Sequence, residues 1–314
     1  MKKSAGARAR RRVDLVLVDR GLTASREKAQ AVILAGLVSA SGVRIDKPGT
    51  LVPEDADLTL AHGPRFVGRG GDKLDGVLDL LGLDVRGISA LDAGASTGGF
   101  TDCLLQRGAA HVVALDVGRG QLDWRLRSDP RVVVHEGVNV RYLEPESVVG
   151  PFDLIVADVS FISLRLVLPV LFPRIRRTVV SGALSPLSTG RGLPGLLALI
   201  KPQFEAGRGE VGKGGVVRDP ETQFTAIVSV VEAVSGASGD SSSRPAATEP
   251  AASSGVQAYG AVRIVESPLR GAEGNREFFV YFREGEGLAE GSLADEARRA
   301  VSGDPSTERE DPHA

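Results

Sequence analysis

The sequence predicts a protein of the α/β class, with an open, mostly parallel sheet preceded by a small α+β module. Three observations support this prediction. Four short apolar runs each end in a charged residue, a glycine-rich turn follows the first of these runs, and the N-terminal part alternates short helix-like and strand-like segments. Continuous apolar runs are typical of parallel strands that are buried on both faces. The length of 314 residues favours two domains, or one domain with appendages.

Composition and charge narrow the class of protein. The single cysteine, Cys103, rules out a disulfide framework and suits a reducing cytosol, and no apolar run is long enough to cross a membrane. We therefore expect a cytoplasmic protein with neither a membrane nor a metal partner. The net charge is only −2, but residues 1–70 carry thirteen lysines and arginines against seven acidic residues. A basic region favours a polyanion as partner, with a solvated tail as the alternative for residues 1–12.

The α+β module is expected over residues 13–62, after a basic, disordered tail over 1–12. Its first helix ends at Gly21, and its second helix is capped by Ser25 and ends at Gly36. Short strands with turn residues between them follow. The expected helices and strands of this module are 13–20, 26–35, 37–39, 43–45 and 58–61.

The larger α/β domain is expected over residues 71–283, after a linker over 63–70. An acidic, disordered tail over 284–314 follows it, in which only residues 288–301 have some helical character. The domain contains two expected insertions, and the second of these is rich in Ser, Ala and Pro and too poor in apolar residues to fold. The two insertions are 181–195 and 235–255.

The charged residues that follow the four apolar runs are expected to converge. The carboxyl ends of parallel strands meet at one edge of the sheet, where the ligand crevice of an open α/β sheet lies. A final pair of strands over 262–266 and 278–283 places Glu277 at the same edge if the second strand is antiparallel. Strand-end punctuation explains any one charged residue, but four in succession favour a site. These four residues are Asp92, Asp116, Asp158 and Lys201.

The glycine-rich turn within residues 91–100 predicts a cofactor cradle, because glycine lets the backbone approach a ligand and a helix follows over 100–106. Its glycine spacing matches neither the dinucleotide fingerprint nor the phosphate-binding P-loop. The acidic Asp92 repels a pyrophosphate but suits a cationic or hydroxyl-rich ligand. S-adenosylmethionine carries a sulfonium, an ammonium and a ribose without phosphates. An ordinary strand-to-helix turn is the alternative.

Two residues further along extend the predicted cofactor site. Asp116 lies 24 residues after Asp92, near the spacing at which an acid binds an adenosine ribose, and Asn139 follows a strand over 132–135 on the adenine side. The expected cofactor contacts are Asp92, Gly94, Ser96, Thr97, Gly98, Gly99, Phe100, Asp116, Val117, Asn139 and Asp158.

The first module resembles the S4-type RNA-binding domain. The matching residues are Arg12-Val13-Asp14, Gly21, Ser25-Arg26-Glu27-Lys28-Ala29, Ile33, Gly36, Val38, Gly42 and Lys47-Pro48. The resemblance implies structured RNA as the partner. Basic side chains on and after this module are then expected to contact RNA phosphates. They are Arg12, Arg26, Lys28, Lys47, Arg65 and Arg69.

The larger domain resembles the FtsJ-like methyltransferases, and with the first module the chain resembles the TlyA, or hemolysin A, family. The matching stretches include Arg69-Gly70-Gly71, 91–102, 114–118, 158–164, 201–205, 211–219 and 274–279. The resemblance implies a Rossmann-like, S-adenosylmethionine-dependent methyltransferase sheet and methylation of cytidine ribose 2′-hydroxyls in small- or large-subunit rRNA. It also implies a catalytic tetrad of Lys73, Asp158, Lys201 and Glu277, of which only Lys73 was not already placed at the crevice.

Such a tetrad has a clear chemical use. A ribose 2′-hydroxyl is a weak nucleophile, so holding it in line with the methyl group supplies much of the rate. Lys201 is the candidate to orient or deprotonate the hydroxyl, and a free lysine, with a pKa near ~10.4, needs burial or a second cation to act as a base. Lys73 is the candidate second cation, while Asp158 and Glu277 fix the two lysines. Proton loss after methyl transfer has begun is the alternative order.

Three other functions compete with methyl transfer. A membrane-active hemolysin is suggested by the older family label, but no spanning segment supports it. A non-catalytic RNA-binding assembly factor requires the tetrad to be unused. A nicotinamide-dependent oxidoreductase is the weakest alternative, because the glycine spacing is wrong for a dinucleotide.

Overall fold

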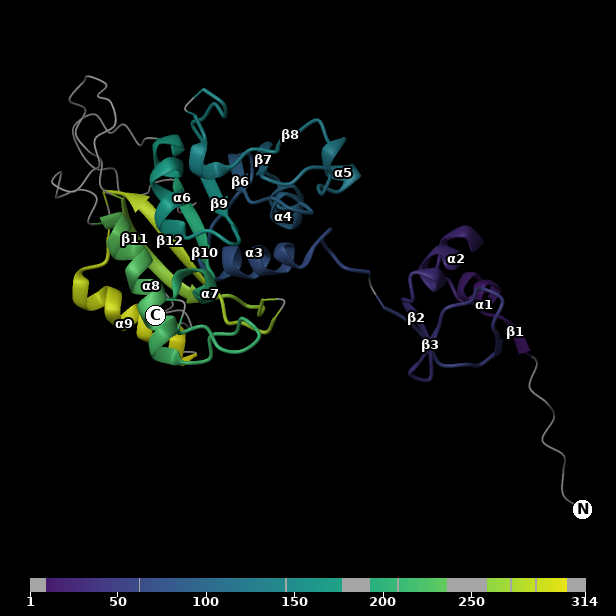
Figure 1. Ribbon diagram of the computed structural model, residues 1–314. Coiled ribbons are helices and arrows are strands. Elements are labelled where there is room, and N and C mark those ends of the chain that lie inside the picture. Colours follow the sequence, from purple (N-terminus) through teal and green to yellow (C-terminus); the bar gives the residue numbers. More distant parts are fainter. Residues whose placement is uncertain are drawn as a thin grey trace, which may run out of the picture. The chain divides into compact units, whose positions relative to one another are not determined.

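The computed structural model describes residues 10–303, apart from 62, 145, 177–192, 208, 236–258, 272 and 286. The chain divides into two units, residues 1–65 and residues 66–314 (Figure 1). The gaps at 177–192 and 236–258 include most of the two expected insertions, which thus lie largely outside the described residues. The expected boundary also moves, because the linker predicted over 63–70 is shared between the two units.

The first unit is the expected α+β module, with two small sheets and two helices around one apolar core. The core contains Val13 and Leu17 of the first helix, Ile33 of the second, and Val38 of a strand, all at most 1% exposed. The Ser25 side chain accepts a hydrogen bond from the Lys28 amide and caps the second helix, as predicted. The elements are β1 (Arg10–Arg12), α1 (Val13–Asp19), α2 (Arg26–Leu34), β2 (Val38–Ala40), β3 (Val43–Ile45), β4 (Leu51–Pro53) and β5 (Leu58–Leu60).

The expectation that residues 1–12 are disordered is wrong for residues 10–12. These three arginines form β1, which pairs antiparallel with β4 from Arg10 opposite Pro53 to Arg12 opposite Leu51. A run of charged residues gives no apolar periodicity, so β1 was not predicted. Its partner β4 was not predicted either, because it has only three residues and ends at Pro53. Residues 1–9 lie outside the described part of the chain.

A buried carboxylate in the first unit binds two of its arginines. Asp14 is fully buried and accepts hydrogen bonds from Arg12 at 3.0 and 2.9 Å, from Arg26 at 3.0 Å and from Gln30 at 3.2 Å. The hydrogen bonds from Arg12 hold the pKa of Asp14 well below its usual range. Two of the arginines that were expected to contact RNA therefore also hold the fold together.

The second unit is built on a seven-stranded sheet with the strand order β11-β12-β10-β9-β6-β7-β8. The four pairs of adjacent strands between β10 and β8 in this order are parallel. The strand β12 is antiparallel to both of its neighbours, β10 and β11. The predicted, mostly parallel sheet is confirmed, and β12 is antiparallel, which is the condition under which Glu277 was expected at the shared edge. The strands are β6 (Ser89–Ala93), β7 (His111–Asp116), β8 (Val132–Glu136), β9 (Leu154–Ala157), β10 (Gly195–Ile200), β11 (Tyr259–Glu266) and β12 (Phe278–Glu284).

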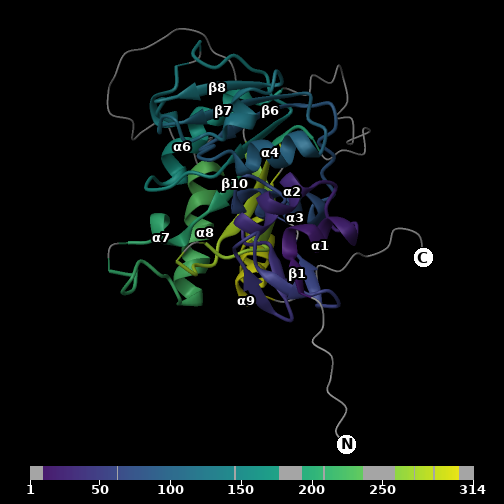
Figure 2. The same cartoon turned by 90° about the vertical axis from the view of Figure 1, so that its right-hand side faces the viewer.

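Helices cover both faces of this sheet. Successive residues of a strand point to opposite faces, and the central strands are apolar on both, so each face needs a covering layer. On one face α6, α8 and α9 pack against residues such as Ile155 and Val280, and on the other α3 and α4 pack against residues such as Val156 and Phe279. Figure 2 shows α8 and α4 on either side of β10. The helices are α3 (Arg69–Leu80), α4 (Gly99–Gln106), α5 (Trp124–Arg127), α6 (Leu164–Leu171), α7 (Pro202–Glu205), α8 (Pro220–Ser235) and α9 (Glu290–Ser302).

Both ends of the second unit differ from the expectation. Phe66 is 2% exposed and packs in the core with Leu74, so the chain from residue 66 belongs to the folded unit rather than to a linker. The tail expected to be disordered contains α9, which contacts β11 and α8 and buries Leu293, Ala297 and Val301. The weak helical character expected for residues 288–301 is an ordered amphipathic helix in the structure, and its apolar residues recur every three to four positions.

Candidate active site

The cofactor edge lies where the strand order reverses. After β6 the chain adds β7 and β8 on one side, and then returns to place β9 and β10 on the other. Ligands of open α/β sheets bind in the crevice outside the carboxyl ends of the strands at such a switch point. A cavity of about 720 Å³ opens at this edge. Six of the predicted cofactor residues line it, namely Gly94, Ser96, Asp116, Val117, Asn139 and Asp158.

The turn after β6 is held by the neighbouring strands. Gly94 has a φ of 91°, and a β-carbon on it would lie 2.4 Å from the backbone oxygen of Asp158. Asp116 at the end of β7 accepts hydrogen bonds from the Ser96 amide at 2.8 Å and from the Gly118 amide at 2.6 Å. The carboxylate of Asp116 therefore fixes the two loops that border the cavity.

Replacing Gly94 by alanine is expected to lower both cofactor affinity and stability. An alanine at this position would have to keep the left-handed backbone conformation of Gly94. Its methyl group would also displace the backbone of Asp158. A residue strained in this way costs about 1–3 kcal/mol. Calorimetric titration with S-adenosylmethionine and thermal melting measure the two effects. Gly120 also has a positive φ, of 69°, but has open space around it, so Gly120→Ala is the matched control for strain alone. Equal cofactor affinity in the two variants would contradict this account.

Five predicted cofactor residues do not line the cavity. Gly98, Gly99 and Phe100 are buried where α4 begins, and a β-carbon on Gly99 would lie 2.9 Å from the Gly71 amide nitrogen of α3. The small size of Gly99 allows the close packing of α4 against α3, whereas Gly98 lies against the side chains of Leu122 and Leu126. Thr97 is exposed, and its side chain lies against Gly68 at the start of α3. The fifth residue is Asp92.

Asp92 lies within β6, since this strand continues to Ala93 rather than ending before Asp92. The Asp92 side chain is fully buried, and its Oδ2 accepts hydrogen bonds from the Thr101 amide at 2.9 Å and the Thr101 hydroxyl at 2.7 Å. Among the described residues its Oδ1 has no hydrogen-bond partner. Burial, with a smaller contribution from Asp158, raises the pKa of Asp92 to about 7. Asp92 therefore anchors α4 beneath the turn.

The four tetrad residues form two ion pairs. Lys73 Nζ lies 2.5 Å from Glu277 Oε2, and both side chains are less than 10% exposed. Lys201 Nζ lies 2.6 Å from Asp158 Oδ1. Charges of opposite sign at these distances in a partly dry site fix each other's direction.

Strand register explains why residues so far apart in sequence meet. Asp158 and Lys201 follow the ends of β9 and β10, which are adjacent parallel strands. Glu277 directly precedes β12, whose first residue, Phe278, pairs with Ile200 at the end of β10. The predictions that placed Asp158, Lys201 and Glu277 at one edge therefore agree with the topology. Lys73 comes from α3 and reaches Glu277 from one face of the sheet.

Sequence reasoning missed two side chains that support this site. Ser160 Oγ lies 2.7 Å from Lys201 Nζ and gives this lysine a second contact. Glu205, in α7, is 8% exposed and accepts hydrogen bonds from the Ser163 hydroxyl at 2.5 Å and the Leu164 amide at 2.7 Å. Burial raises the pKa of Glu205. Glu205 thus ties α7, which follows Lys201, to the start of α6 and the segment that carries Asp158.

Aromatic and aliphatic side chains at the cavity were also not predicted. Tyr142 is 70% exposed and Phe161 is 91% exposed, and both line the cavity with Leu166. Phe161 has a φ of 64° and contacts the ring of Phe204 at a centroid distance of 5.0 Å. These side chains were not predicted because a sequence does not show whether an apolar residue in a loop is exposed at a cavity or buried in the core.

The predicted RNA contacts lie in both units. Lys28, Lys47 and Arg65 are exposed in the first unit. Arg69 begins α3 in the second unit and donates a hydrogen bond to the backbone oxygen of Arg270 at 2.7 Å. No group of three or more potential metal ligands occurs among the described residues. In the same part of the chain, no helix is long and apolar enough to cross a membrane.

The fold and the cavity define a methyltransferase that uses S-adenosylmethionine. The cavity volume lies within the usual range for ligand sites, about 300–1,000 Å³. The cavity is lined by Gly94 of the turn, by the carboxylates Asp116 and Asp158 and by the cation of Arg141. Gly94, Ser96, Asp116 and Asn139, which were predicted to contact the cofactor, all line this cavity.

The chain belongs to the FtsJ-like methyltransferase family, whose model matches residues 66–254. It is 43% identical over 300 residues to the 16S/23S rRNA (cytidine-2′-O)-methyltransferase TlyA of Mycobacterium tuberculosis, covering 94% of this chain and 99% of that protein. It is 34% identical to Hemolysin A of Brachyspira hyodysenteriae, covering 86% and 99%. A solved structure described as a hemolysin from Streptococcus thermophilus matches with a TM-score of 0.60 and 34% identity, covering 94% and 97%.

Proposed function

We propose that this enzyme transfers a methyl group from S-adenosylmethionine to the ribose 2′-hydroxyl of a cytidine in ribosomal RNA of the small subunit, the large subunit or both. The observation that carries the proposal is the pair of lysine–carboxylate contacts, Lys73–Glu277 and Lys201–Asp158, at the edge where the cofactor cavity opens. The similarity over most of the chain to the Mycobacterium tuberculosis enzyme supports the choice of RNA and of cytidine.

In this reaction the cofactor supplies an electrophilic methyl group on a positively charged sulfur. The 2′-oxygen forms a bond to the methyl carbon while the carbon–sulfur bond breaks, and the hydroxyl proton passes to a base or to water. Lys201, fixed by Asp158 and Ser160, is suited to orient the 2′-oxygen. Lys73, fixed by Glu277, supplies a second positive charge. Holding the reacting atoms in line accounts for much of the expected acceleration.

The first unit serves, in this proposal, as an S4-type RNA-binding domain. Its support is the α+β fold and the exposed basic side chains Lys28 and Lys47, which lie outside the Asp14 network. Ribosomal RNA as the substrate implies that the protein acts in the cytoplasm.

The test of the function is methyl transfer to ribosomal subunits in vitro. Purified protein, labelled S-adenosylmethionine, and subunits from a strain that lacks the corresponding gene are incubated, and 2′-O-methyl groups are mapped by resistance to alkaline cleavage. Label at a cytidine 2′-oxygen supports the proposal. Label on a base, or none on either subunit, would overturn it.

Replacing Lys28 and Lys47 by alanine is expected to weaken RNA binding without changing the rate once RNA is bound. Each phosphate contact that is lost removes one counterion from the binding equilibrium, so the slope of log affinity against log salt should fall by about 0.7–0.9 per lysine. Filter binding at several salt concentrations measures this slope. Arg86, exposed in the second unit and paired with Asp84, is the control, and Arg86→Ala should leave the slope unchanged. An unchanged slope in the double lysine variant would remove these lysines from the RNA interface.

A further inference from the structure

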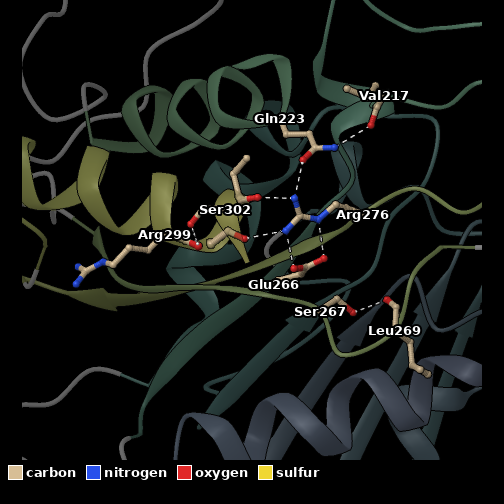
Figure 3. A network of polar contacts seen from close by, with 10 residues as sticks. Val217, Gln223, Glu266, Ser267, Leu269, Arg276, Arg299 and Ser302 are labelled. Carbon is tan, nitrogen blue, oxygen red and sulfur yellow. Dashed lines mark hydrogen bonds and ion pairs between the residues drawn. The ribbon is translucent and has the colours of Figure 1, made fainter. Parts of the chain in front are cut away.

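Arg276 joins several elements directly beside the tetrad. Its guanidinium donates to both carboxylate oxygens of Glu266, at 2.7 and 2.6 Å, and to the backbone oxygen of Ala300 at 3.1 Å. It also donates to the backbone oxygen of Val301 and, at 3.4 Å, to Gln223 Oε1. Figure 3 shows this guanidinium between the end of β11, α8 and the last turn of α9.

The contacts with Ala300 and Val301 attach the end of α9 to the sheet. The last carbonyl groups of a helix have no partner within the helix and carry partial negative charge, so an arginine there satisfies acceptors and complements the helix dipole. Glu266 balances the charge of Arg276, whose side chain is 18% exposed. The C-terminal helix α9 is therefore anchored by the residue that precedes Glu277.

The residue on the other side of Arg276 extends the network. Asn275 is 1% exposed, accepts a hydrogen bond from the Val217 amide at 2.9 Å and donates to the backbone oxygen of Gly215 at 2.9 Å. Gln223, 2% exposed, donates to the backbone oxygen of Val217 at 2.9 Å. Arg276, Gln223, Val217 and Asn275 thus form a closed ring that fixes both the approach to β12 and the segment that precedes α8.

Glu277 depends on this arrangement for its position. Its backbone oxygen accepts a hydrogen bond from the Ser267 amide at 2.8 Å, and its carboxylate packs so closely on Gly271 that a β-carbon there would lie 2.5 Å from Oε1. Lys73 is its ion-pair partner at 2.5 Å. The two residues before Glu277 are held from one side by α8 and α9 and from the other by the segment at Gly215.

We propose that Arg276 is a positioning residue for methyl transfer, which sets Glu277 against Lys73 by locking the start of β12 to α8 and α9. The proposal rests on the proposed function, since it assigns a role within that reaction. Arg276 touches no reacting atom. It acts by keeping the carboxylate that fixes Lys73 in place, so the C-terminal helix is part of the apparatus that aligns the reaction.

The kinetic test compares two arginines that both attach α9 to the sheet. Arg276→Met removes the donors beside Glu277, whereas Arg263→Met removes the 2.9 Å contact of Arg263 with Glu296 of α9, away from the tetrad. We expect kcat to fall about 10- to 100-fold in the first variant, because misplacement of about 1 Å can cost 10²-fold, with S-adenosylmethionine affinity unchanged. The second variant should keep its kcat, even where its melting temperature falls equally. Equal losses of kcat in both variants, or none in either, would overturn the proposal.

A readout independent of turnover separates this proposal from the proposed function. Hydrogen–deuterium exchange in peptides covering 273–278 and 214–218 should speed up in Arg276→Met but not in Arg263→Met. Arg276→Lys, which keeps a cation but loses the paired contact with Glu266, should give intermediate exchange and partial recovery of kcat, and it replaces Arg276→Met if that variant does not fold. Unchanged exchange would overturn the positioning role, whereas faster exchange with no activity of the unaltered enzyme on rRNA would overturn only the proposed function.

Discussion

Replacing Lys201 by alanine is expected to reduce the rate of methyl transfer roughly 10²- to 10⁴-fold, the range for loss of a positioned group that handles a proton. Lys201 Nζ is held at 2.6 Å from Asp158 and 2.7 Å from Ser160, with the side chain 11% exposed, so the substitution removes a cation that is fixed in position at the site. Single-turnover transfer of labelled methyl groups to ribosomal subunits measures the rate. Cofactor affinity and melting temperature should stay close to those of the unaltered enzyme.

Two further variants decide what Lys201 does. Lys201→Arg keeps a cation beside Asp158 but cannot lose its proton in a protein, so it should remain active if Lys201 only orients the hydroxyl and be inactive if Lys201 accepts the proton. Lys213→Ala, which removes an exposed lysine in the segment after α7, is the control for loss of a cation outside the tetrad. It should leave the single-turnover rate unchanged. A Lys201→Ala variant that keeps more than about a tenth of the rate would remove Lys201 from the chemistry.

The convergence of Asp158, Lys201 and Glu277 could be predicted because it depends on two general rules. Apolar runs identify buried strands, and the ends of adjacent parallel strands share an edge. Once the last strand is antiparallel, its first residue must face the same edge, and the pairing of Ile200 with Phe278 places Glu277 there. Lys73 lies on a helix, where strand-end logic does not apply, and only the family resemblance pointed to it.

The cofactor turn was predicted less accurately, because sequence spacing does not separate ligand contacts from packing. Gly94 borders the cavity, but Gly99 allows α4 to approach α3, and Phe100 stacks on Phe279 in the core at a centroid distance of 6.2 Å. A glycine needed for a ligand and a glycine needed for a neighbouring helix look alike in one sequence. β6 also continues two residues beyond its expected end at Leu91, so Asp92 lies within the strand with its side chain fully buried.

The Arg276 network could not be found from sequence at all. The side-chain contacts of Arg276 join residues that are 10 to 53 positions apart, and its partners Glu266 and Gln223 are common residue types that lie outside the motifs of the sequence. The same applies to Glu205, which contacts Ser163 at a separation of 42 residues. Long-range polar contacts depend on the packing of complete helices, so they appear only when the tertiary structure is known.

Replacing Asp92 by asparagine is expected to change how stability depends on pH. The pKa of Asp92 is raised from an ordinary value near ~3.9 to about 7, so between these two pH values the folded state binds more protons than the unfolded state. The free energy of unfolding therefore falls as pH rises from about 4 to about 7. Three pKa units correspond to an upper limit of about 4 kcal/mol. Asparagine keeps an acceptor for Thr101 and does not titrate, so this loss should disappear.

The measurement is thermal or urea unfolding of both proteins from pH 5 to pH 8. The melting temperature of Asp92→Asn, relative to the unaltered protein, should rise with pH, because only the latter must carry a buried charge above pH 7. Asp129 is the control, because its pKa is shifted in the opposite direction: the hydrogen bond from Arg131 lowers it. It is ionised in both states throughout this range, so Asp129→Asn should shift the melting temperature equally at every pH. A pH-independent difference for Asp92→Asn would mean that Asp92 does not titrate near neutral pH in the folded protein.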